Sequence, residues 1–334
     1  MKKALLVLAL SAISAASYAA DPVLLRISHV TTAGSPKGMG ADKFKSLVEK
    51  NSNGEIRVEV YHAGTKFGDR EEMKALEKGE VEMLAPSVAK LNVFYKNVAD
   101  NPWVVLEMPF LFNSLESVSA VEKAGVIEEM NQTLKVSYAS VAGFWDNGLT
   151  YLSTPYKMTK WEDFQGLKMR IQPSSILKAS VESWGATPRV LAYGELGTGT
   201  FYGSVNSSFN PPSNVLGSNL MTSQRYLYRT NNAYLGYVLL FNRKWWDGLS
   251  PAHKAVISKS LEETRSFQAA AARSENDRAE ERIQNNGSMR VVDMDPALLA
   301  RMKKESEQVV KVLSPSQKAY YDKIKAAVAK APKK

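Results

Sequence analysis

The chain reads Gly166-Leu-Lys-Met-Arg-Ile-Gln-Pro-Ser-Ser175 within the stretch 160–212, and its organisation can be worked out from there. Leu167, Met169 and Ile171 alternate with Lys168 and Arg170, which predicts a short strand with one apolar face. Residues 172–175 form a loop that can cap a new helix. A guanidinium at a strand end beside a helix N-terminus suits a carboxylate. On the residues alone, Arg170 could equally pair with a surface carboxylate, so both interpretations stay open.

The N-terminus has the pattern of a secretory signal peptide over residues 1–19. Lys2 and Lys3 provide the positive start, residues 4–15 are almost wholly apolar, and Ser17-Tyr-Ala19 fits the cleavage rule. The mature chain is therefore expected to begin at Ala20. A retained anchor is the alternative, but the apolar run is short for a membrane span.

Composition limits the class of protein. The chain has no cysteine, so an exported protein of this sequence has no disulfides and depends on its core. About 315 mature residues predict roughly two domains. The net charge of +9 falls by two to +7 without Lys2 and Lys3. Apart from residues 323–334 the basic residues are scattered, which favours attraction of a small anion, or solubility, over nucleic acid as a partner.

The first third alternates strands and helices. Strands are expected over 24–29, 55–61 and 81–85, with helices over 38–49 and 70–78 between them, the second capped by Asp69. A β-α-β-α-β order predicts a mostly parallel sheet with helices on its faces. Ligands of such sheets bind beyond the carboxyl ends of the strands, which here are residues 28–32, 61–64 and 85–90.

The rest of the chain predicts a second lobe and several crossings between the lobes. Two short helices over 114–135 and a strand over 136–145 lead to Asp146-Asn-Gly148, interpreted as a turn at the first crossing. The second lobe contains the strand 167–171 and the helix 175–184, and a strand over 233–241 returns to the first lobe. Ser250-Pro251 predicts the start of a helix that reaches residue 285 and lies across both lobes. A strand over 289–292 and helices over 296–310 and 315–331 close the chain.

The predicted fold class is therefore α/β with two lobes, hinge-crossing strands and a long helix spanning both lobes. Lobe I is assigned to residues 20–147 plus about 236–275, and lobe II to residues 148–235 plus about 276–331.

Several motifs that could indicate other chemistry are rejected. The glycine-rich segment 197–203 does not follow a strand in a βαβ start, so no dinucleotide cofactor is expected. His29, His62 and His253 are far apart in a chain without cysteine, so neither a metal site nor any other cofactor is expected. No serine lies in Gly-x-Ser-x-Gly with a plausible histidine partner. The chain is therefore not predicted to be an enzyme.

A series of short motifs resembles one family along essentially the whole mature chain. The motifs are Gly64-Thr-Lys-Phe-Gly-Asp69, Ala75-Leu-Glu-Lys-Gly79, Glu107-Met-Pro-Phe-Leu-Phe112, Gly143-Phe-Trp-Asp-Asn-Gly148, Asp163-Phe-Gln-Gly-Leu-Lys-Met-Arg170 and Gly185-Ala-Thr-Pro188. In this order and spacing they resemble the DctP family, the solute-binding proteins of tripartite ATP-independent periplasmic (TRAP) transporters. The resemblance implies a type II-like periplasmic-binding-protein fold, a location in the periplasm, and the small and large TRAP permease subunits as partners. It leaves a monomer or a dimer open.

The resemblance also implies site residues. Arg170 matches the family arginine that forms a two-pronged salt bridge with the ligand carboxylate, which agrees with guanidinium geometry. Asn210, in Asn206-Ser-Ser-Phe-Asn210-Pro211, matches a family asparagine beside the ligand. Thr150 stands where many relatives have a second arginine. Lys90 matches a basic position on the first lobe, although it could equally be an exposed lysine. The remaining candidate ligand-binding positions are Tyr193, Trp145, His29 and Asn232.

The expected function is a receptor that captures a small organic anion by hinge closure and delivers it to the permease. A monocarboxylate is favoured because Thr150 replaces a cation and aromatic residues lie near the site. An exported enzyme acting on an organic acid, and a subunit that presents its ligand to a sensor, remain as alternatives.

Overall fold

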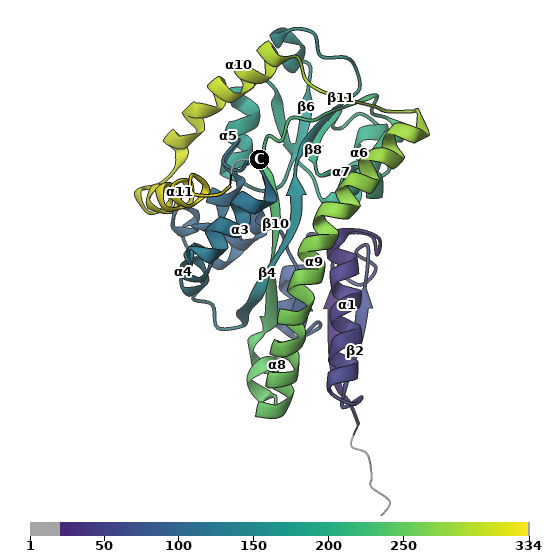
Figure 1. Ribbon diagram of the computed structural model, residues 1–334, viewed down its shortest axis with the longest axis vertical. Coiled ribbons are helices and arrows are strands. Elements are labelled where there is room, and N and C mark those ends of the chain that lie inside the picture. Colours follow the sequence, from purple (N-terminus) through teal and green to yellow (C-terminus); the bar gives the residue numbers. More distant parts are fainter. Residues whose placement is uncertain (1–20, 333–334) are drawn as a thin grey trace, which may run out of the picture.

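The computed structural model describes residues 21–332, which form two lobes, each built on its own β-sheet (Figure 1). The predicted fold class is confirmed, because the chain is α/β, strands pass between the two sheets, and one long helix lies along both lobes. The predicted signal peptide and the expected start of the mature chain at Ala20 lie outside the described residues.

Lobe I contains a five-stranded sheet with the order β2-β1-β3-β10-β4. Its strands are β1 (Val23–Ser28), β2 (Ile56–Tyr61), β3 (Met83–Leu84), β4 (Ala139–Leu149) and β10 (Tyr234–Asn242). The first three are parallel, as the β-α-β-α-β pattern predicts, and β10 is antiparallel to both of its neighbours. The carboxyl ends of β1 and β3 therefore meet at one edge of the sheet, which faces lobe II.

Lobe II contains a six-stranded sheet with the order β11-β9-β5-β8-β6-β7. Its strands are β5 (Tyr151–Thr154), β6 (Lys168–Ile171), β7 (Thr187–Val190), β8 (Ser207–Asn210), β9 (Tyr226–Tyr228) and β11 (Arg290–Val292). Strand β6 lies parallel between β7 and β8, so Arg170 is held by neighbours on both sides. The strand predicted over 167–171 thus becomes an interior strand of this sheet.

Helices cover both sheets. In lobe I they are α1 (Pro36–Asn51), α2 (Glu72–Lys78), α3 (Leu115–Lys123), α4 (Val126–Gln132), α8 (Arg243–Gly248) and α11 (Pro315–Val328), with 3₁₀ turns η1 (Val88–Phe94), η2 (Val98–Asp100) and η3 (Trp103–Glu107). In lobe II they are α5 (Ser175–Ser183), α6 (Leu196–Phe201), α7 (Pro212–Gly217) and α10 (Pro296–Ser306), with η4 (Trp161–Phe164), η5 (Tyr193–Glu195), η6 (Leu220–Thr222) and η7 (Glu307–Val312).

The start and the buried face of helix α1, beside the cleft, follow from its sequence. The hydroxyl of Ser35 accepts a hydrogen bond from the Gly38 amide at 3.1 Å, and Pro36 occupies the first helical position. Both features stabilise a helix N-terminus. Phe44 and Val48 are fully buried against the sheet, so the helix is fixed in position by its apolar face.

Helix α9 (Pro251–Asn286) joins the lobes along their length (Figure 1). It contacts α1 and β4 in lobe I, and α7 and β11 in lobe II. Two strand connections also cross the hinge and are bonded to each other, because the Thr150 amide donates to the Ala233 carbonyl at 2.9 Å. Ser250 caps the helix and Gly287, with φ of 75°, ends it, as the sequence predicts.

Three local predictions are corrected. Residues 146–148 do not form a turn, because β4 continues through them to Leu149 and pairs with β10. Asp69 does not cap a helix, because α2 begins three residues later and the Asp69 side chain bonds elsewhere. Helix α11 packs against α3 and α4 of lobe I, although the sequence analysis assigned residues 276–331 to lobe II.

Gly236 in β10 provides a test of packing at the hinge. A Cβ atom there would lie 2.4 Å from Cζ of Phe144 and 2.8 Å from the Tyr234 ring. We expect Gly236→Ala to lower the free energy of unfolding by about 1–3 kcal/mol, since the side chains must shift to admit the methyl group. Chemical denaturation would measure this. The control is Gly248→Ala, which meets nothing within 4 Å; equal effects of the two changes would contradict the packing argument.

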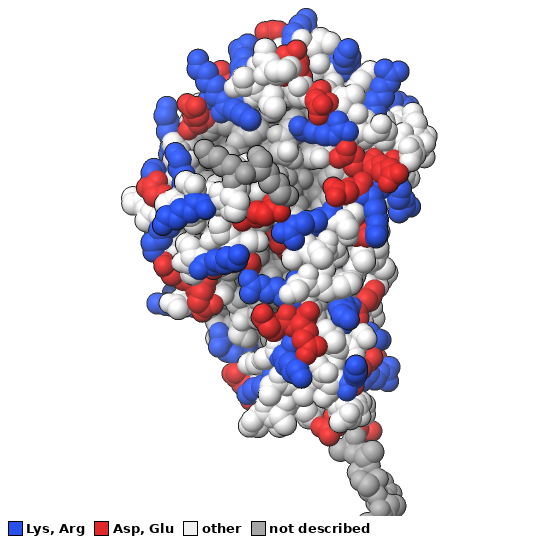
Figure 2. Space-filling view, viewed as in Figure 1, with Lys and Arg blue, Asp and Glu red and all other residues white. Residues whose placement is uncertain are grey.

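The charged side chains on the face drawn in Figure 2 are of both signs and interspersed, so this face has no extended patch of one sign. Among residues 21–332, none of the helices combines the length and the apolar character that crossing a bilayer requires.

Candidate ligand-binding site

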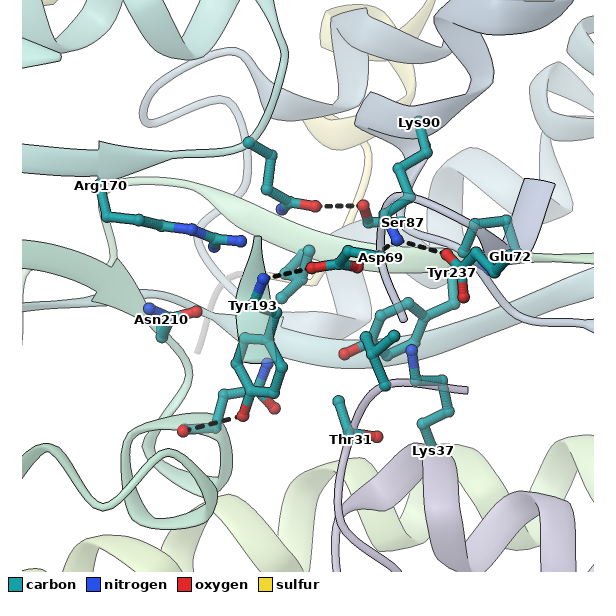
Figure 3. A pocket seen from close by; sticks show the side chains of 15 residues that line it. Thr31, Lys37, Asp69, Glu72, Ser87, Lys90, Arg170, Tyr193, Asn210 and Tyr237 are labelled. Atoms are coloured by element: carbon teal, nitrogen blue, oxygen red, sulfur yellow. Dashed lines mark hydrogen bonds and ion pairs between the residues drawn. The ribbon is translucent and has the colours of Figure 1, made fainter. Parts of the chain in front are cut away.

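A small cavity of about 20 Å³ lies between the two lobes (Figure 3). Lobe I contributes the ends of β1 and β3, the start of α1 and the segment before α2, and lobe II contributes β6, the end of β8 and the segment after β7. The lining residues are Val30, Thr31, Lys37, Asp69, Glu72, Pro86, Ser87, Lys90, Arg170, Gln172, Tyr193, Asn210, Asn214, Leu235 and Tyr237.

Arg170 is the main cation on the lobe II wall. Its side chain comes from β6, the residue is only 6% exposed, and its Nε donates to the Leu191 carbonyl at 2.8 Å. Among the described residues no carboxylate lies within 4.0 Å of its guanidinium. Burial lowers the pKa of Arg170 and the nearby Asp69 opposes this, but an arginine remains charged at neutral pH. The outer nitrogens of a buried guanidinium are thus left to face the cavity.

Asn210 and Tyr193 flank this guanidinium. Asn210 is 2% exposed at the end of β8, and its Nδ2 donates to the Ser208 hydroxyl at 3.3 Å. Tyr193 is half-buried, and its hydroxyl donates to the Asn214 carbonyl at 3.0 Å, which fixes the ring beside the cavity. Burial raises the pKa of Tyr193 to about 12, so the phenol is neutral.

Lys90 lies between two carboxylates on the lobe I wall. Its Nζ donates to Asp69 and to Glu72, and all three side chains are at most 10% exposed. Burial favours the neutral amine, but the charges of Glu72 and Asp69 outweigh it and raise the pKa of Lys90. For Asp69 the nearby Lys90 outweighs burial and lowers the pKa, whereas burial keeps the pKa of Glu72 raised. Lys90 is therefore already paired within the protein.

Lys37 differs from Lys90 in its partners, although it is even more buried. It is the second residue of α1 and 2% exposed. Its Nζ donates to the Ala85 carbonyl at 3.0 Å and lies 3.8 Å from the centre of the Tyr237 ring. In the described part of the chain no carboxylate lies within 4.0 Å of this ammonium. Burial lowers the pKa of Lys37 to about 7.

Contacts between the lobes close the cavity on two sides. The Tyr193 amide donates to the Asp69 carboxylate, and the Ser87 hydroxyl donates to Gln172. At the rim, Arg70 forms a two-pronged ion pair with Glu195, with N–O distances of 2.5 and 2.7 Å. The structure therefore shows the lobes brought together around the cavity.

The structure brings four of the predicted site residues into this lining, namely Arg170, Asn210, Tyr193 and Lys90. It places the other four elsewhere. Trp145, 2% exposed, packs in the lobe I core, and His29, 1% exposed, bonds His62 behind the wall at 2.9 Å. Thr150 and Asn232 are bonded to each other at the hinge, 3.3 Å apart, and are not part of the lining.

The lining also includes residues that no sequence motif indicated as ligand contacts, namely Lys37, Asp69, Gln172, Asn214 and Tyr237. A signal existed for part of the lining: residues at the ends of β1 and β3 were expected at a ligand-binding edge. No local pattern distinguishes Lys37 from the other lysines of α1, because its Nζ contacts Ala85 and Tyr237, which are distant in the sequence.

Two lobes that meet over a cavity, with the buried guanidinium of Arg170 in its wall, are the arrangement of a solute-binding protein. The family model of bacterial extracellular solute-binding proteins, family 7 (DctP), matches residues 27–316. The chain therefore belongs to the DctP family, the solute-binding receptors of TRAP transporters, as the sequence resemblance predicts.

Individual relatives agree with this assignment. The C4-dicarboxylate-binding periplasmic protein DctP of Rhodobacter capsulatus is 35% identical over 269 residues, 80% of each chain. A TRAP periplasmic solute-binding protein of Pseudomonas aeruginosa PAO1, solved with bound L-malate, is 30% identical with a TM-score of 0.81, covering 87% of this chain and 99% of that one. One from Shewanella oneidensis, solved with bound succinate, is 24% identical with a TM-score of 0.87, covering 92% and 99%, and shows the fold alone.

Proposed function

We propose that this protein is the periplasmic receptor of a TRAP transporter for a small organic acid, whose carboxylate Arg170 holds between the lobes. The observation that carries the proposal is the guanidinium of Arg170, which is 6% exposed and has no acid partner among the described residues. A buried charge is costly unless it is paired, so this cation is suited to a carboxylate that enters the cavity.

Binding and closure are coupled in this proposal. Arg170, Asn210 and Tyr193 belong to lobe II, whereas Lys37 and Lys90 belong to lobe I. A ligand that contacts both walls binds the closed arrangement more tightly than the open one and shifts the population towards it. Closure also excludes water, which strengthens the salt bridge.

The preference for a monocarboxylate has no support in the cavity or in the relatives. It was based on Thr150, which lies at the hinge and takes no part in the lining, and on nearby aromatic residues, of which Trp145 lies in the core and Tyr193 lines the cavity without discriminating between the two classes of acid. Of the relatives described above, the one that is 35% identical is named as binding C4-dicarboxylates, and the one that is 30% identical was solved with bound L-malate. We therefore include four-carbon dicarboxylates among the acids proposed for this chain.

The acid is delivered unchanged to the small and large membrane subunits of the permease in this proposal. The relatives are transport proteins, which favours capture over catalysis, so an exported enzyme is the less supported alternative. Incubation with a bound acid, followed by mass spectrometry, separates the two: recovery of an altered acid would contradict the proposal.

A panel of organic acids, tested by thermal shift and then by isothermal titration calorimetry, gives the direct test. We expect at least one acid to raise the melting temperature, because a ligand that binds only the folded state stabilises it, by about 2.7 kcal/mol at a hundredfold excess over Kd. The matched control is the amide of the same acid, which lacks the anion. Equal stabilisation by acid and amide would contradict a carboxylate receptor.

A further inference from the structure

The segment 191–195 of lobe II connects the cavity with the outer edge of the cleft. It follows β7 and contains the short turn η5. The Leu191 carbonyl accepts the hydrogen bond from Nε of Arg170 at 2.8 Å, and Tyr193 lines the cavity. The last residue, Glu195, lies at the rim. A contact that fixes this segment therefore also fixes two groups of the wall that faces the ligand.

Two consecutive residues of lobe I hold η5 at both of its ends. The Asp69 carboxylate accepts a hydrogen bond from the amide of Tyr193, the first residue of η5. Arg70 donates through both outer nitrogens to the two carboxylate oxygens of Glu195, the last residue of η5, at 2.5 and 2.7 Å. Each contact has one partner in each lobe, so both are broken when the lobes separate.

The two contacts differ in their surroundings. The side chain of Asp69 is 9% exposed and also accepts from Lys90, so it belongs to a buried network of lobe I. The side chains of Arg70 and Glu195 are 64% and 40% exposed, and neither residue lines the cavity. The outer ion pair can therefore be changed without altering a ligand contact or the core of lobe I.

An exposed ion pair usually contributes little, because water and salt screen it and two long side chains lose freedom. Two features favour a measurable contribution from Arg70 and Glu195. Their fork-to-fork geometry provides two parallel charge-assisted hydrogen bonds. The neighbouring contact between Asp69 and Tyr193 already brings the two chain segments together, so less freedom is lost when the pair forms.

We infer that Arg70 and Glu195 form a latch on the closed lobes, which positions the segment behind Tyr193 and Arg170 and slows the departure of the ligand. This inference rests on the proposed function, in which Arg170 holds the acid. Because the latch touches no ligand and exists only after closure, it acts on the dissociation rate and not on the choice of acid.

The test measures association and dissociation rates of L-malate, or of the tightest acid of the panel if L-malate does not bind. The chain has no cysteine, so Glu77→Cys on α2 and Arg189→Cys on β7, both exposed, place one dye on each lobe. Energy transfer between the dyes in a stopped-flow instrument then reports opening and closing. The melting temperature of each variant checks its folding.

The variants are Arg70→Met, Glu195→Gln and the exchanged pair Arg70→Glu with Glu195→Arg. We expect each single change to raise the dissociation rate constant about three- to fivefold at low ionic strength, and the exchanged pair to recover most of the loss. The control is Lys74→Met, an exposed lysine of α2, which should change neither rate constant. Salt screens an exposed pair, so the differences from wild type should shrink between about 20 mM and about 500 mM salt.

The two single variants also separate a latch from long-range attraction of the anion. Removing a cation at Arg70 and removing an anion at Glu195 have opposite effects on attraction, which changes the association rate, but the same effect on a latch. Opposite changes in association with an unchanged dissociation rate would overturn the inference, as would a loss that the exchanged pair does not recover. The proposed function stands in both cases. If no acid of the panel closes the labelled lobes or stabilises the protein, the proposed function fails and this inference fails with it.

Discussion

Replacing Arg170 with alanine is expected to abolish measurable binding of the acid. The guanidinium is buried and its outer nitrogens face the cavity, so its loss leaves a desolvated carboxylate without a partner. Truncating one member of such a pair costs about 2–5 kcal/mol, which is roughly 30-fold to several thousand-fold in Kd. The fold should survive, because no carboxylate among residues 21–332 forms an ion pair with this side chain, and the hydrogen bond from its Nε to the Leu191 carbonyl is a single contact.

Isothermal titration with the best acid of the panel measures this effect, and the melting temperature without ligand shows that the variant is folded. Arg170→Lys should also weaken binding, because an ammonium cannot supply two parallel donors to one carboxylate. The control is Arg189→Ala on β7, which is paired directly with Arg170 in the sheet but is exposed. A wild-type Kd in Arg170→Ala, or an equal loss in Arg189→Ala, would contradict the assignment of Arg170.

The elements of the fold were largely predictable because each is determined locally. Strand alternation at residues 167–171, and the Ser-Pro pair at 250–251 that starts α9, are patterns in a few neighbouring residues. The prediction of a turn at 146–148 was wrong because it, too, used only a few neighbouring residues. Asp-Asn-Gly favours a turn locally, but β4 pairs with β10 on both sides of this motif, and the motif becomes an irregularity in the register, between Asp146 and Gly148, instead of a turn.

The site was only partly predictable. Short motifs gave the positions of some residues in a known fold, and four residues predicted in this way do line the cavity: Arg170, Asn210, Tyr193 and Lys90. Trp145 does not line the cavity. Alternation along β4 directs its ring into the core beneath α1, where Gly40 packs against it. That direction depends on the register of β4 against β10, which no local pattern determines.

The contacts of Asp69 and Glu72 could not be predicted from the sequence either. Asp69 was predicted to cap the helix that follows it, and no role was predicted for Glu72. The structure pairs both with Lys90, which lies 21 residues after Asp69 and 18 residues after Glu72. A buried network of this kind depends on tertiary packing, so sequence spacing cannot reveal it.

Replacing Lys90 with methionine is expected to destabilise the protein strongly, independently of any ligand. The side chains of Asp69 and Glu72 are 9% and 1% exposed, and both lose their ammonium partner in this variant. Removing one partner of a buried ion pair costs about 3–5 kcal/mol, because the remaining charge is uncompensated. Denaturation at pH 7 measures the loss, and Lys78→Met on α2, whose side chain is 55% exposed, should change stability by less than about 0.5 kcal/mol.

The pH dependence of this loss distinguishes an orphaned charge from lost packing. Without Lys90, burial raises the pKa values of Asp69 and Glu72 above their unfolded values of 3.8 and 4.5. The folded variant then binds more protons than the unfolded chain, so its stability falls as the pH rises from about 4 to 7. In the wild type the pKa of Asp69 is lowered instead, and its contribution is lost as the pH falls. The gap between wild type and Lys90→Met should therefore be widest near pH 7 and narrow towards pH 4, and adding Glu72→Gln should recover part of it. A gap that is constant over this range would show that the methionine disturbs packing and that the ion pair contributes nothing.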